Sequence, residues 1–266
     1  MNKVLEKIID YKKLELESQK RKVTLKDLRF QVEDTSPARD FLNALRCPGI
    51  RVIAEIKKAS PSAGLIRPDF DPVAIAQSYE QNGAAALSIL TDEHFFQGSL
   101  KDLEKVKKVV PLPLLRKDFT LDAYQIYEAR AAGADAVLLI VRILEPAQIK
   151  DYLDLATELG MSALLEVHDE EDLKKTKPLV AKIIGINNRD LDTLKIDLET
   201  SVKLSKNIPQ GTASQGTLIV SESGISSSSD VQKLQRVGIN TFLIGESLLR
   251  AKDSGKALKE ILDQQG

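Results

Sequence analysis

The sequence contains very few residues with soft or metal-binding side chains. It has one cysteine, two histidines and no tryptophan among 266 residues. The single thiol of Cys47 excludes an internal disulfide, and His94 and His168 lie too far apart in the sequence to indicate a metal-ligand cluster. We therefore expect no metal site, and a reducing compartment such as the cytoplasm fits this composition best.

An excess of one charge and long apolar runs are also missing. The 38 basic and 39 acidic residues leave a formal charge of −1, which provides no overall field to attract nucleic acid or an anionic membrane. No apolar run approaches the roughly 20 residues of a membrane span, and the charged N-terminal segment lacks the apolar core of a signal peptide. We expect a monomer without nucleic-acid or membrane partners, so any anionic ligand must be bound by local groups.

A repeated pattern is present instead. Four helix-like stretches end in glycine and are followed by an apolar strand, at Gly83, Gly133, Gly160 and Gly238. The intervals between successive glycines are close to two times, one time and three times about 26 residues. This is the length of a βα unit with short loops, roughly 26 residues. Filling the gaps predicts strands near residues 51–56, 84–90, 113–117, 135–141, 161–166, 181–187, 217–221 and 240–244.

Eight continuous apolar strands alternating with helices are typical of a (β/α)₈ TIM barrel. The alternative is an open doubly wound sheet, but the loop after the first strand, KKASPSAG, does not match the glycine-rich G-x-G-x-x-G turn of that fold. We interpret residues 1–266 as a single domain in which residues 1–48 form a helical N-terminal extension.

Within this extension we expect a helix up to about residue 22, a second over TLKDLRFQVED, and a third over SPARDFLNAL, with Ser36 as its cap and Pro37 in its first position. Near the other end of the chain, the polar residues 207–216 indicate a surface loop before the seventh strand.

Polar side chains gather where the strands end, which is the end of a barrel that carries active sites. Because side chains alternate along a strand, Glu55 and Lys57 are expected to point together into the barrel mouth. Lys117 and Glu166 occupy similar positions. We interpret Lys58, Arg116 and Asp118 as ordinary solvated loop residues.

Two later motifs indicate a phosphate site. SESGIS and LIGESLL each end a strand with a glycine followed by a helical stretch, an arrangement whose free backbone N–H groups bind phosphate after strands seven and eight of many barrels. Phe96 and Phe119, also near strand ends, are candidates for the wall of an aromatic-ring pocket.

Taken together, the motifs EIKKASPSAG, LTDEHFFQGS, LRKDF, GADAVLLIV, LLEVH, IGINNRDL, VSESGI and FLIGESLL resemble the indole-3-glycerol-phosphate synthase family of tryptophan biosynthesis. The resemblance runs from about residue 50 to 250. It implies a carboxy-lyase that needs no cofactor. The enzyme would close the ring of 1-(2-carboxyphenylamino)-1-deoxyribulose 5-phosphate, a phosphorylated small molecule, with loss of carbon dioxide and water.

The resemblance also implies roles for the residues at the strand ends. Lys117 would be the general acid for the ketone oxygen, while Lys57, held by Glu55, would pair with the substrate carboxylate and assist a later proton transfer. Glu166 would relay a proton during dehydration. Asn187 and Glu222 would hydrogen-bond the substrate or the lysines. We expect neighbouring cations and partial burial to lower the pKa of Lys117.

The remaining implied residues would bind the substrate. The phosphate loops would contain Ser60, Ser223, Gly224, Gly245 and Glu246, with the carboxylate of Glu246 pointing away so that its amide alone contributes. The lining of the aromatic-ring pocket would consist of Phe96, Phe119, Leu138, Leu191 and Leu243. Arg189 matches a motif position whose role is structural or in substrate binding.

Three alternatives remain open from the sequence. A Schiff-base aldolase also uses lysines at barrel strand ends. A phosphoribosylanthranilate isomerase has a similar fold and ligand, although its motifs differ. A barrel that binds a phosphorylated ligand without catalysis would need neither the two lysines nor Glu166.

Overall fold

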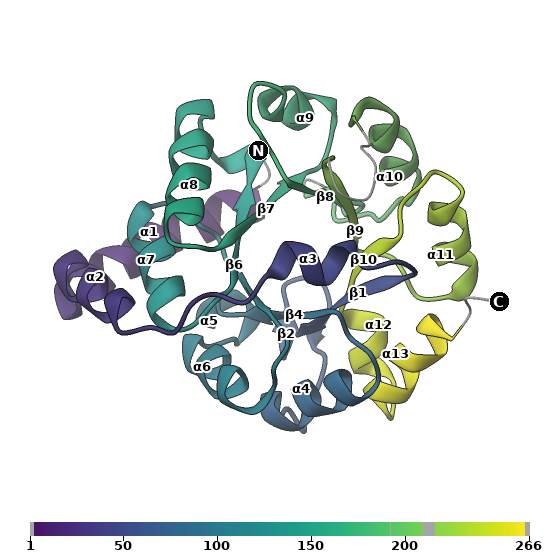
Figure 1. Ribbon diagram of the computed structural model, residues 1–266, viewed down its shortest axis with the longest axis horizontal. Helices are drawn as coiled ribbons and strands as arrows, with labels where there is room; N and C mark the ends of the chain where they lie inside the picture. Colours follow the sequence, from purple (N-terminus) through teal and green to yellow (C-terminus); the bar gives the residue numbers. More distant parts are fainter. Residues whose placement is uncertain (1–2, 192, 210–215, 264–266) are drawn as a thin grey trace.

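The computed structural model describes residues 3–191, 193–209 and 216–263, and its centre is a closed barrel of parallel strands (Figure 1). In spatial order the strands are β1 (Arg51–Ile56), β10 (Thr241–Ile244), β9 (Leu218–Glu222), β8 (Ile183–Asn187), β7 (Ser162–Val167), β6 (Ala136–Ile140), β5 (Leu114–Lys117) and β4 (Ala86–Leu90). Because β1 pairs with both β4 and β10, the sheet has no open edge. The predicted (β/α)₈ barrel is confirmed, and the open doubly wound sheet is wrong.

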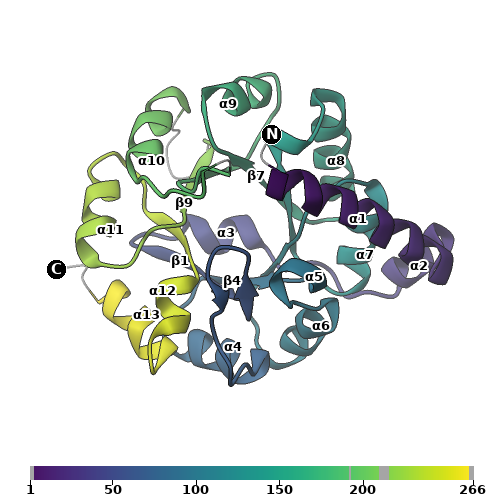
Figure 2. The ribbon, with the colours of Figure 1, turned by 180° about the vertical axis from the view of Figure 1, so that it is seen from behind.

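A ring of helices surrounds the barrel (Figures 1 and 2). These are α4 (Pro72–Gln81), α6 (Leu100–Val109), α7 (Ala123–Ala131), α8 (Pro146–Glu158), α9 (Glu170–Thr176), α10 (Glu199–Leu204), α11 (Ser228–Gln235) and α13 (Ser254–Leu262). Shorter elements follow several strands: a hairpin of β2 (Ala59–Ser60) and β3 (Gly64–Leu65), α5 (Glu93–Phe96), α12 (Glu246–Arg250) and the 3₁₀ turns η1 (Val141–Ile143) and η2 (Ser205–Asn207).

The apolar strands are buried on both faces, as the continuous runs in the sequence predict. One face packs against the helix ring, with side chains such as Val52, Leu139 and Phe242 fully buried between the two layers. The other face fills the barrel interior with Ile53, Leu115 and other apolar residues. The interior is therefore a packed core, and a ligand must bind at one end of it.

The N-terminal extension forms α1 (Lys3–Lys22), α2 (Leu25–Glu33) and α3 (Phe41–Arg46), which lie at different places around the barrel. Helix α3 lies across one end (Figure 1), where Phe41 and Leu45 pack into the barrel interior. Helix α1 lies at the opposite end, on the side seen in Figure 2. The extension therefore contacts both ends of the barrel.

The third helix begins later than the sequence indicates. It starts at Phe41, and the side chain of Asp40 caps it by accepting a hydrogen bond from the N–H of Asn43, so the predicted cap at Ser36 is wrong. The reason is a set of long-range contacts that keep residues 36–40 out of helix. The carbonyl of Ser36 accepts from Arg130, while the guanidinium of Arg39 donates to backbone carbonyls beside β5.

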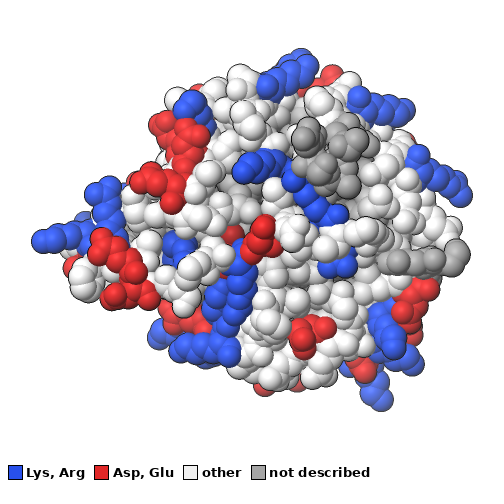
Figure 3. Space-filling view, in the orientation of Figure 1, with Lys and Arg blue, Asp and Glu red and all other residues white. Residues whose placement is uncertain are grey.

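Two further expectations concern the surface. Residues 210–215 of the predicted loop 207–216 lie outside the described residues, and Asn207 belongs to η2. Basic and acidic side chains are interspersed over the face that carries α3 (Figure 3). Among the helices of the described chain, none combines the length and apolar character needed to cross a bilayer.

Candidate active site

A cavity of about 590 Å³ opens at the carboxyl end of the barrel, opposite α3. Every residue that the sequence analysis assigns to the site lines this cavity: Glu55, Lys57, Ser60, Phe96, Lys117, Phe119, Leu138, Glu166, Asn187, Arg189, Leu191, Glu222, Ser223, Gly224, Leu243, Gly245 and Glu246. The placement follows from the parallel barrel, because all its strands deliver their last residues to the same end.

Lys117, at the end of β5, is surrounded by carboxylates. Its Nζ lies 2.6 Å from Oε2 of Glu166 and 3.2 Å from Oε2 of Glu222. These acids come from β7 and β9, so three alternate strands contribute one charged group each. The carboxyl group of Glu222 fits beside β8 because residue 185 is glycine, and a Cβ atom there would collide with Oε1 of Glu222.

Lys57 and Glu55 form the second charged group of the site. They project from the end of β1 toward the cavity, as alternation along the strand predicts, and Nζ of Lys57 donates a hydrogen bond to Oε1 of Glu55. Gly245 lies against Glu55 and has no side chain to displace it. The ammonium group of Lys57 is therefore oriented by a buried carboxylate.

The structure overturns the expected direction of the Lys117 pKa. Burial alone would lower it, but the carboxylates of Glu166, Glu222 and Glu55 outweigh burial and hold the pKa of Lys117 above its ordinary value. The prediction of neighbouring cations is wrong, because the nearest charged neighbours of this lysine are acids. Lys117 is a firmly protonated ammonium in this site.

The two acids beside Lys117 are shifted in opposite directions. Burial favours a high pKa for both, but the ammonium of Lys117 and the imidazole of His168 hold the pKa of Glu166 well below its usual range. Burial raises the pKa of Glu222 to about 8, and the negative charge of Glu166 adds to this effect. Because Glu166 is closer to Lys117, it keeps the negative charge while Glu222 retains a proton at neutral pH.

His168 is a residue that the sequence analysis does not assign to the site. Its ring lies behind Glu166, with Nε2 3.2 Å from Oε1 of Glu166 and Nδ1 3.3 Å from Oδ2 of Asp172. Burial would lower its pKa, but hydrogen bonds to Asp172 and Glu166 raise the pKa of His168 to about 9. The available signal was the spacing from Glu166, since residues two apart on a strand lie on the same face.

Asn187 joins the loops after β8 and β9. Its side-chain oxygen accepts from the N–H of Arg189 at 3.0 Å and from Oγ of Ser223 at 2.9 Å, which directs its NH₂ group away from both donors. Arg189 also donates to the carbonyl of Leu194, so it supports the loop while it lines the cavity.

The two predicted phosphate loops differ in backbone geometry. Helix α12 begins directly after Gly245, as expected, whereas residues 225–227 separate Gly224 from α11. Gly224 has φ +81°, and a Cβ atom there would collide with Ile196. Oγ of Ser247 donates to the carbonyl of Ile225 at 2.9 Å and links the two loops. The carboxylate of Glu246 pairs with Arg250 at 2.9 Å.

The apolar wall of the cavity contains residues from the extension that the motifs do not reveal. The rings of Phe96 and Phe119 lie 6.1 Å apart between centroids, and Leu138, Leu191 and Leu243 are also in the wall. Helix α1 adds Val4, Leu5 and Ile8. Their helical spacing in the sequence was the signal for an apolar face.

Two residues interpreted as solvated are buried, and this interpretation is wrong. Arg116 and Asp118 are both 4% exposed. Asp118 accepts a hydrogen bond from Thr91 at 2.6 Å, while Arg116 pairs with Glu128 at 2.7 Å. Loop position alone does not show which carboxylates and cations lie opposite such residues. Lys58 is partly buried, and its carbonyl accepts from the N–H of Ile66.

The sequence matches the family profile described as "Indole-3-glycerol phosphate synthase" over residues 5–261. The chain belongs to this family. Curated relatives named indole-3-glycerol phosphate synthase include one from Neisseria gonorrhoeae, 47% identical with 96% of this chain and 97% of the relative covered, and one from Albidiferax ferrireducens, 46% identical with 98% of each covered. Membership confirms the expected enzyme class, a carboxy-lyase of tryptophan biosynthesis, over the isomerase, the aldolase and the non-catalytic barrel.

Solved structures show the same fold in more distant proteins. A 3-hexulose-6-phosphate synthase superposes with a TM-score of 0.62 at 16% identity, covering 80% of this chain and 99% of that one. An N-acetylmannosamine-6-phosphate 2-epimerase from Clostridium perfringens gives a TM-score of 0.60 at 14% identity, covering 79% and 90%. At these identities the likeness concerns the barrel alone.

Proposed function

We propose that this indole-3-glycerol phosphate synthase family member closes the indole ring of 1-(2-carboxyphenylamino)-1-deoxyribulose 5-phosphate with Lys117 as the general acid. The observation that carries the proposal is the position of one protonated lysine at the centre of the cavity, between Glu166 at 2.6 Å and Glu222 at 3.2 Å. An ammonium held above its ordinary pKa is fully charged at neutral pH, and the alkoxide formed during ring closure is basic enough to take its proton.

In the first step, the aromatic carbon that bears the carboxylate attacks the ketone carbon. A carbon–carbon bond forms, the carbonyl π bond opens, and Lys117 transfers a proton to the developing alkoxide. Lys57 faces the same cavity with its charge oriented by Glu55, so it is placed to pair with the substrate carboxylate. Release of carbon dioxide then returns the bonding electrons to the ring and restores its aromaticity.

In the last step, Lys57, free once carbon dioxide has left, donates a proton to the new hydroxyl, which leaves as water, and the neighbouring ring carbon loses a proton. Glu166 is the ionised carboxylate of the site and is suited to accept or relay that proton. Glu222 retains its own proton and can donate a hydrogen bond, as can the NH₂ group of Asn187. The division of labour between the acids thus follows from their opposite pKa shifts.

The substrate would lie across the cavity from its aromatic wall to the loops after β9 and β10. Phe96, Phe119, Leu138, Leu191 and Leu243 provide apolar surface for the ring. Ser60, Ser223, Gly224, Gly245 and the amide of Glu246 surround the proposed phosphate position, and Arg189 lies at its edge. The first N–H groups of α12 have no partners within the helix and are available to the phosphate.

We further propose that residues 1–266 form one domain that acts as a monomer in the cytoplasm without a metal or other cofactor. Among the described residues, no three acidic, histidine or cysteine side chains are grouped so that they could hold a metal ion.

The test is to incubate the purified protein with the carboxyphenylamino-deoxyribulose phosphate and to follow indole absorbance and fluorescence. We expect the absorbance and fluorescence of the newly formed indole ring to appear, together with one equivalent of carbon dioxide. Borohydride added during turnover should leave no adduct on Lys117 or Lys57. A trapped imine, or binding without release of carbon dioxide, would contradict the proposal.

A further inference from the structure

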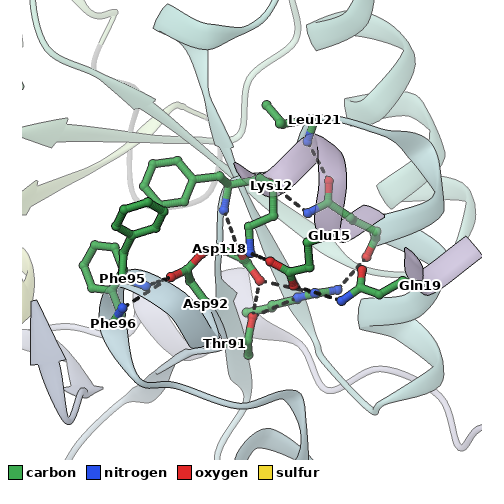
Figure 4. Close-up of polar contacts among 12 residues, drawn as sticks. Lys12, Glu15, Gln19, Thr91, Asp92, Phe95, Phe96, Asp118 and Leu121 are labelled. Atoms are coloured by element: carbon green, nitrogen blue, oxygen red, sulfur yellow. Dashed lines mark hydrogen bonds and ion pairs between the residues drawn. The ribbon is translucent and has the colours of Figure 1, made fainter. Parts of the chain in front are cut away.

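Helix α1 contains a lysine that is almost completely buried. The side chain of Lys12 is 1% exposed, and its Nζ lies 2.9 Å from Oε2 of Glu15, 2.9 Å from Oδ2 of Asp92 and 3.0 Å from Oδ1 of Asp118 (Figure 4). Glu15 belongs to the same helix, whereas Asp92 and Asp118 follow β4 and β5. One ammonium group therefore joins α1 to two loops of the barrel mouth.

Each of these two aspartates also fixes the backbone beside one aromatic ring of the cavity wall. Oδ1 of Asp92 accepts from the N–H groups of Phe95 and Phe96, at 2.7 and 3.3 Å, and so caps α5. Oδ1 of Asp118 accepts from the N–H of Phe119 at 2.8 Å. Two of the three carboxylates that bind Lys12 thus also hold the backbone of Phe96 and Phe119 in place.

Lys12 lies on the face of α1 that covers the cavity. Ile8 and Leu5 line the cavity one and two turns before it and are buried. Next to Lys12, the ring of Tyr11 stacks on His94 of α5 with centroids 3.9 Å apart. The contacts of α1 with α5 therefore combine an ion pair with ring stacking.

The charge balance shows why the ammonium matters. Asp92 is completely buried and Asp118 is 4% exposed, so both carboxylates depend on nearby cations. Arg116 lies 3.3 Å from Asp118, and Lys12 contacts both acids. Without the Lys12 charge, two buried anions would repel each other, and the segments they fix would separate.

We propose that Lys12 is a positioning residue that sets the distance between Phe96 and Phe119 and thereby shapes the slot for the aromatic ring of the substrate. This inference rests on the proposed function for the identity of that ring. Lys12 does not line the cavity, so it acts through the two aspartates and through the docking of α1. The structure assigns to the extension a part in recognising the ring, separate from the chemistry at Lys117.

The test uses Lys12→Met, which keeps the side-chain length and removes the charge, with Lys12→Arg as the conservative variant. Lys20→Met is the matched control, because Lys20 also ties α1 to the barrel, at 2.6 Å from Asp122, but lies away from the cavity. We expect Lys12→Met to raise the KM about ten-fold with kcat within about two-fold, Lys12→Arg to recover most of this loss, and Lys20→Met to behave as the parent enzyme.

Binding experiments separate this inference from the proposed function. The substrate with its ketone reduced to an alcohol cannot cyclise, and its Kd can be measured by calorimetry whether or not the protein turns over. Ribulose 5-phosphate, which lacks the ring, is the second probe. We expect Lys12→Met to raise the Kd of the reduced analogue about ten-fold and to leave the Kd of ribulose 5-phosphate unchanged.

The proposal would be overturned if Lys12→Met weakened the binding of both probes equally. Equal changes in the Kd of the reduced analogue for Lys12→Met and Lys20→Met would also overturn it. If Lys12→Met fails to fold, Asp92→Asn provides the same test. Asparagine can still cap α5, but the ion pair through which Lys12 joins α5 to α1 is lost, and this variant tests that link without adding repulsion between two anions. In that variant too, weaker binding of the reduced analogue alone supports the proposal. Unchanged binding of both probes refutes the proposal. If the parent enzyme shows no turnover, this result contradicts the proposed function, and the binding experiments still test the role of Lys12.

Discussion

Lys117 Nζ and Glu166 Oε2 lie 2.6 Å apart at the carboxyl ends of β5 and β7, strands separated by β6. The pair is nearly inaccessible to solvent, with side chains 14% and 2% exposed. A proton donor and an ionised acceptor are thus fixed in contact at the cavity before a ligand arrives. The roles proposed for them can be tested separately.

Replacing Lys117 by alanine should remove most turnover and leave substrate binding nearly intact. General acid catalysis typically contributes about 100-fold to 10,000-fold, so kcat should fall by at least about 100-fold, with the Kd of the reduced substrate analogue changed by only a few-fold. Steady-state kinetics and calorimetry measure the two effects. Lys101→Ala, at an exposed position on α6, is the control. Normal kcat in Lys117→Ala would refute the role.

The pKa of Glu222, raised to about 8, predicts a pH effect on substrate capture. Below this pH the carboxyl group is protonated and neutral, and above it a further negative charge enters a cavity that must accept an anionic substrate. We expect kcat/KM to decline as pH rises through about 8, and Glu222→Gln to lose this decline because its amide does not ionise. A pH profile of kcat/KM for both proteins checks this. If kcat/KM of Glu222→Gln still declines through about pH 8, the decline arises from another ionisable group.

His168 should stabilise the fold most strongly at neutral and lower pH. Its pKa of about 9 in the folded protein exceeds the ordinary value of 6.5, so the contribution is fully present below about 6.5 and is lost as pH rises through 9. A shift of this size corresponds to about 3 kcal/mol.

Urea unfolding at pH 6.5, 8 and 9.5 measures this contribution as the difference in the free energy of unfolding between the parent and His168→Gln. The difference should shrink as pH rises. His94→Gln is the matched control, because His94 is the other histidine and is exposed. A difference that does not depend on pH would show that His168 acts through packing alone.

Gly185→Ala should displace Glu222, because a Cβ atom at this position would collide with its carboxylate. We expect a loss of stability of about 1–3 kcal/mol and a fall in kcat. Gly160→Ala is the comparison, since its φ of +74° makes alanine unfavourable although no atom lies within 4 Å. It should lose about 1 kcal/mol and keep its kcat. Equal kcat in both variants would contradict the proposed packing of Glu222.

The sequence was most informative where local pattern and fold agree. A strand that is buried on both faces needs a continuous apolar run, so the runs that end in Glu55, Lys117 and Glu166 indicate strands. A parallel barrel then brings the last residues of these strands together. The grouping of the site residues could therefore be predicted before their contacts were known. Their proposed roles came from the resemblance to a known family, because strand position alone does not specify a reaction.

The errors arose where distant residues decide the outcome. Ser36 and Pro37 carry a good helix-start signal, but Arg130 and Arg39 hold this segment against the barrel instead. Lys117 was expected among cations, although its neighbours Glu166 and Glu222 come from strands much later in the chain. Such contacts depend on the closed barrel and leave no mark on the local sequence.

The position of α3 has a consequence for how the chain is made. Phe41 and Leu45 belong to the same interior apolar cluster as Val220 and Leu243, and Arg46 donates to the carbonyl of Gly216 at 2.8 Å. During translation these apolar side chains leave the ribosome before any strand, and part of the interior cluster that they join, on β9 and β10, is among the last to be synthesised. Helix α3 is therefore made before the barrel strands, and its full set of contacts can form only after the last strands have been made.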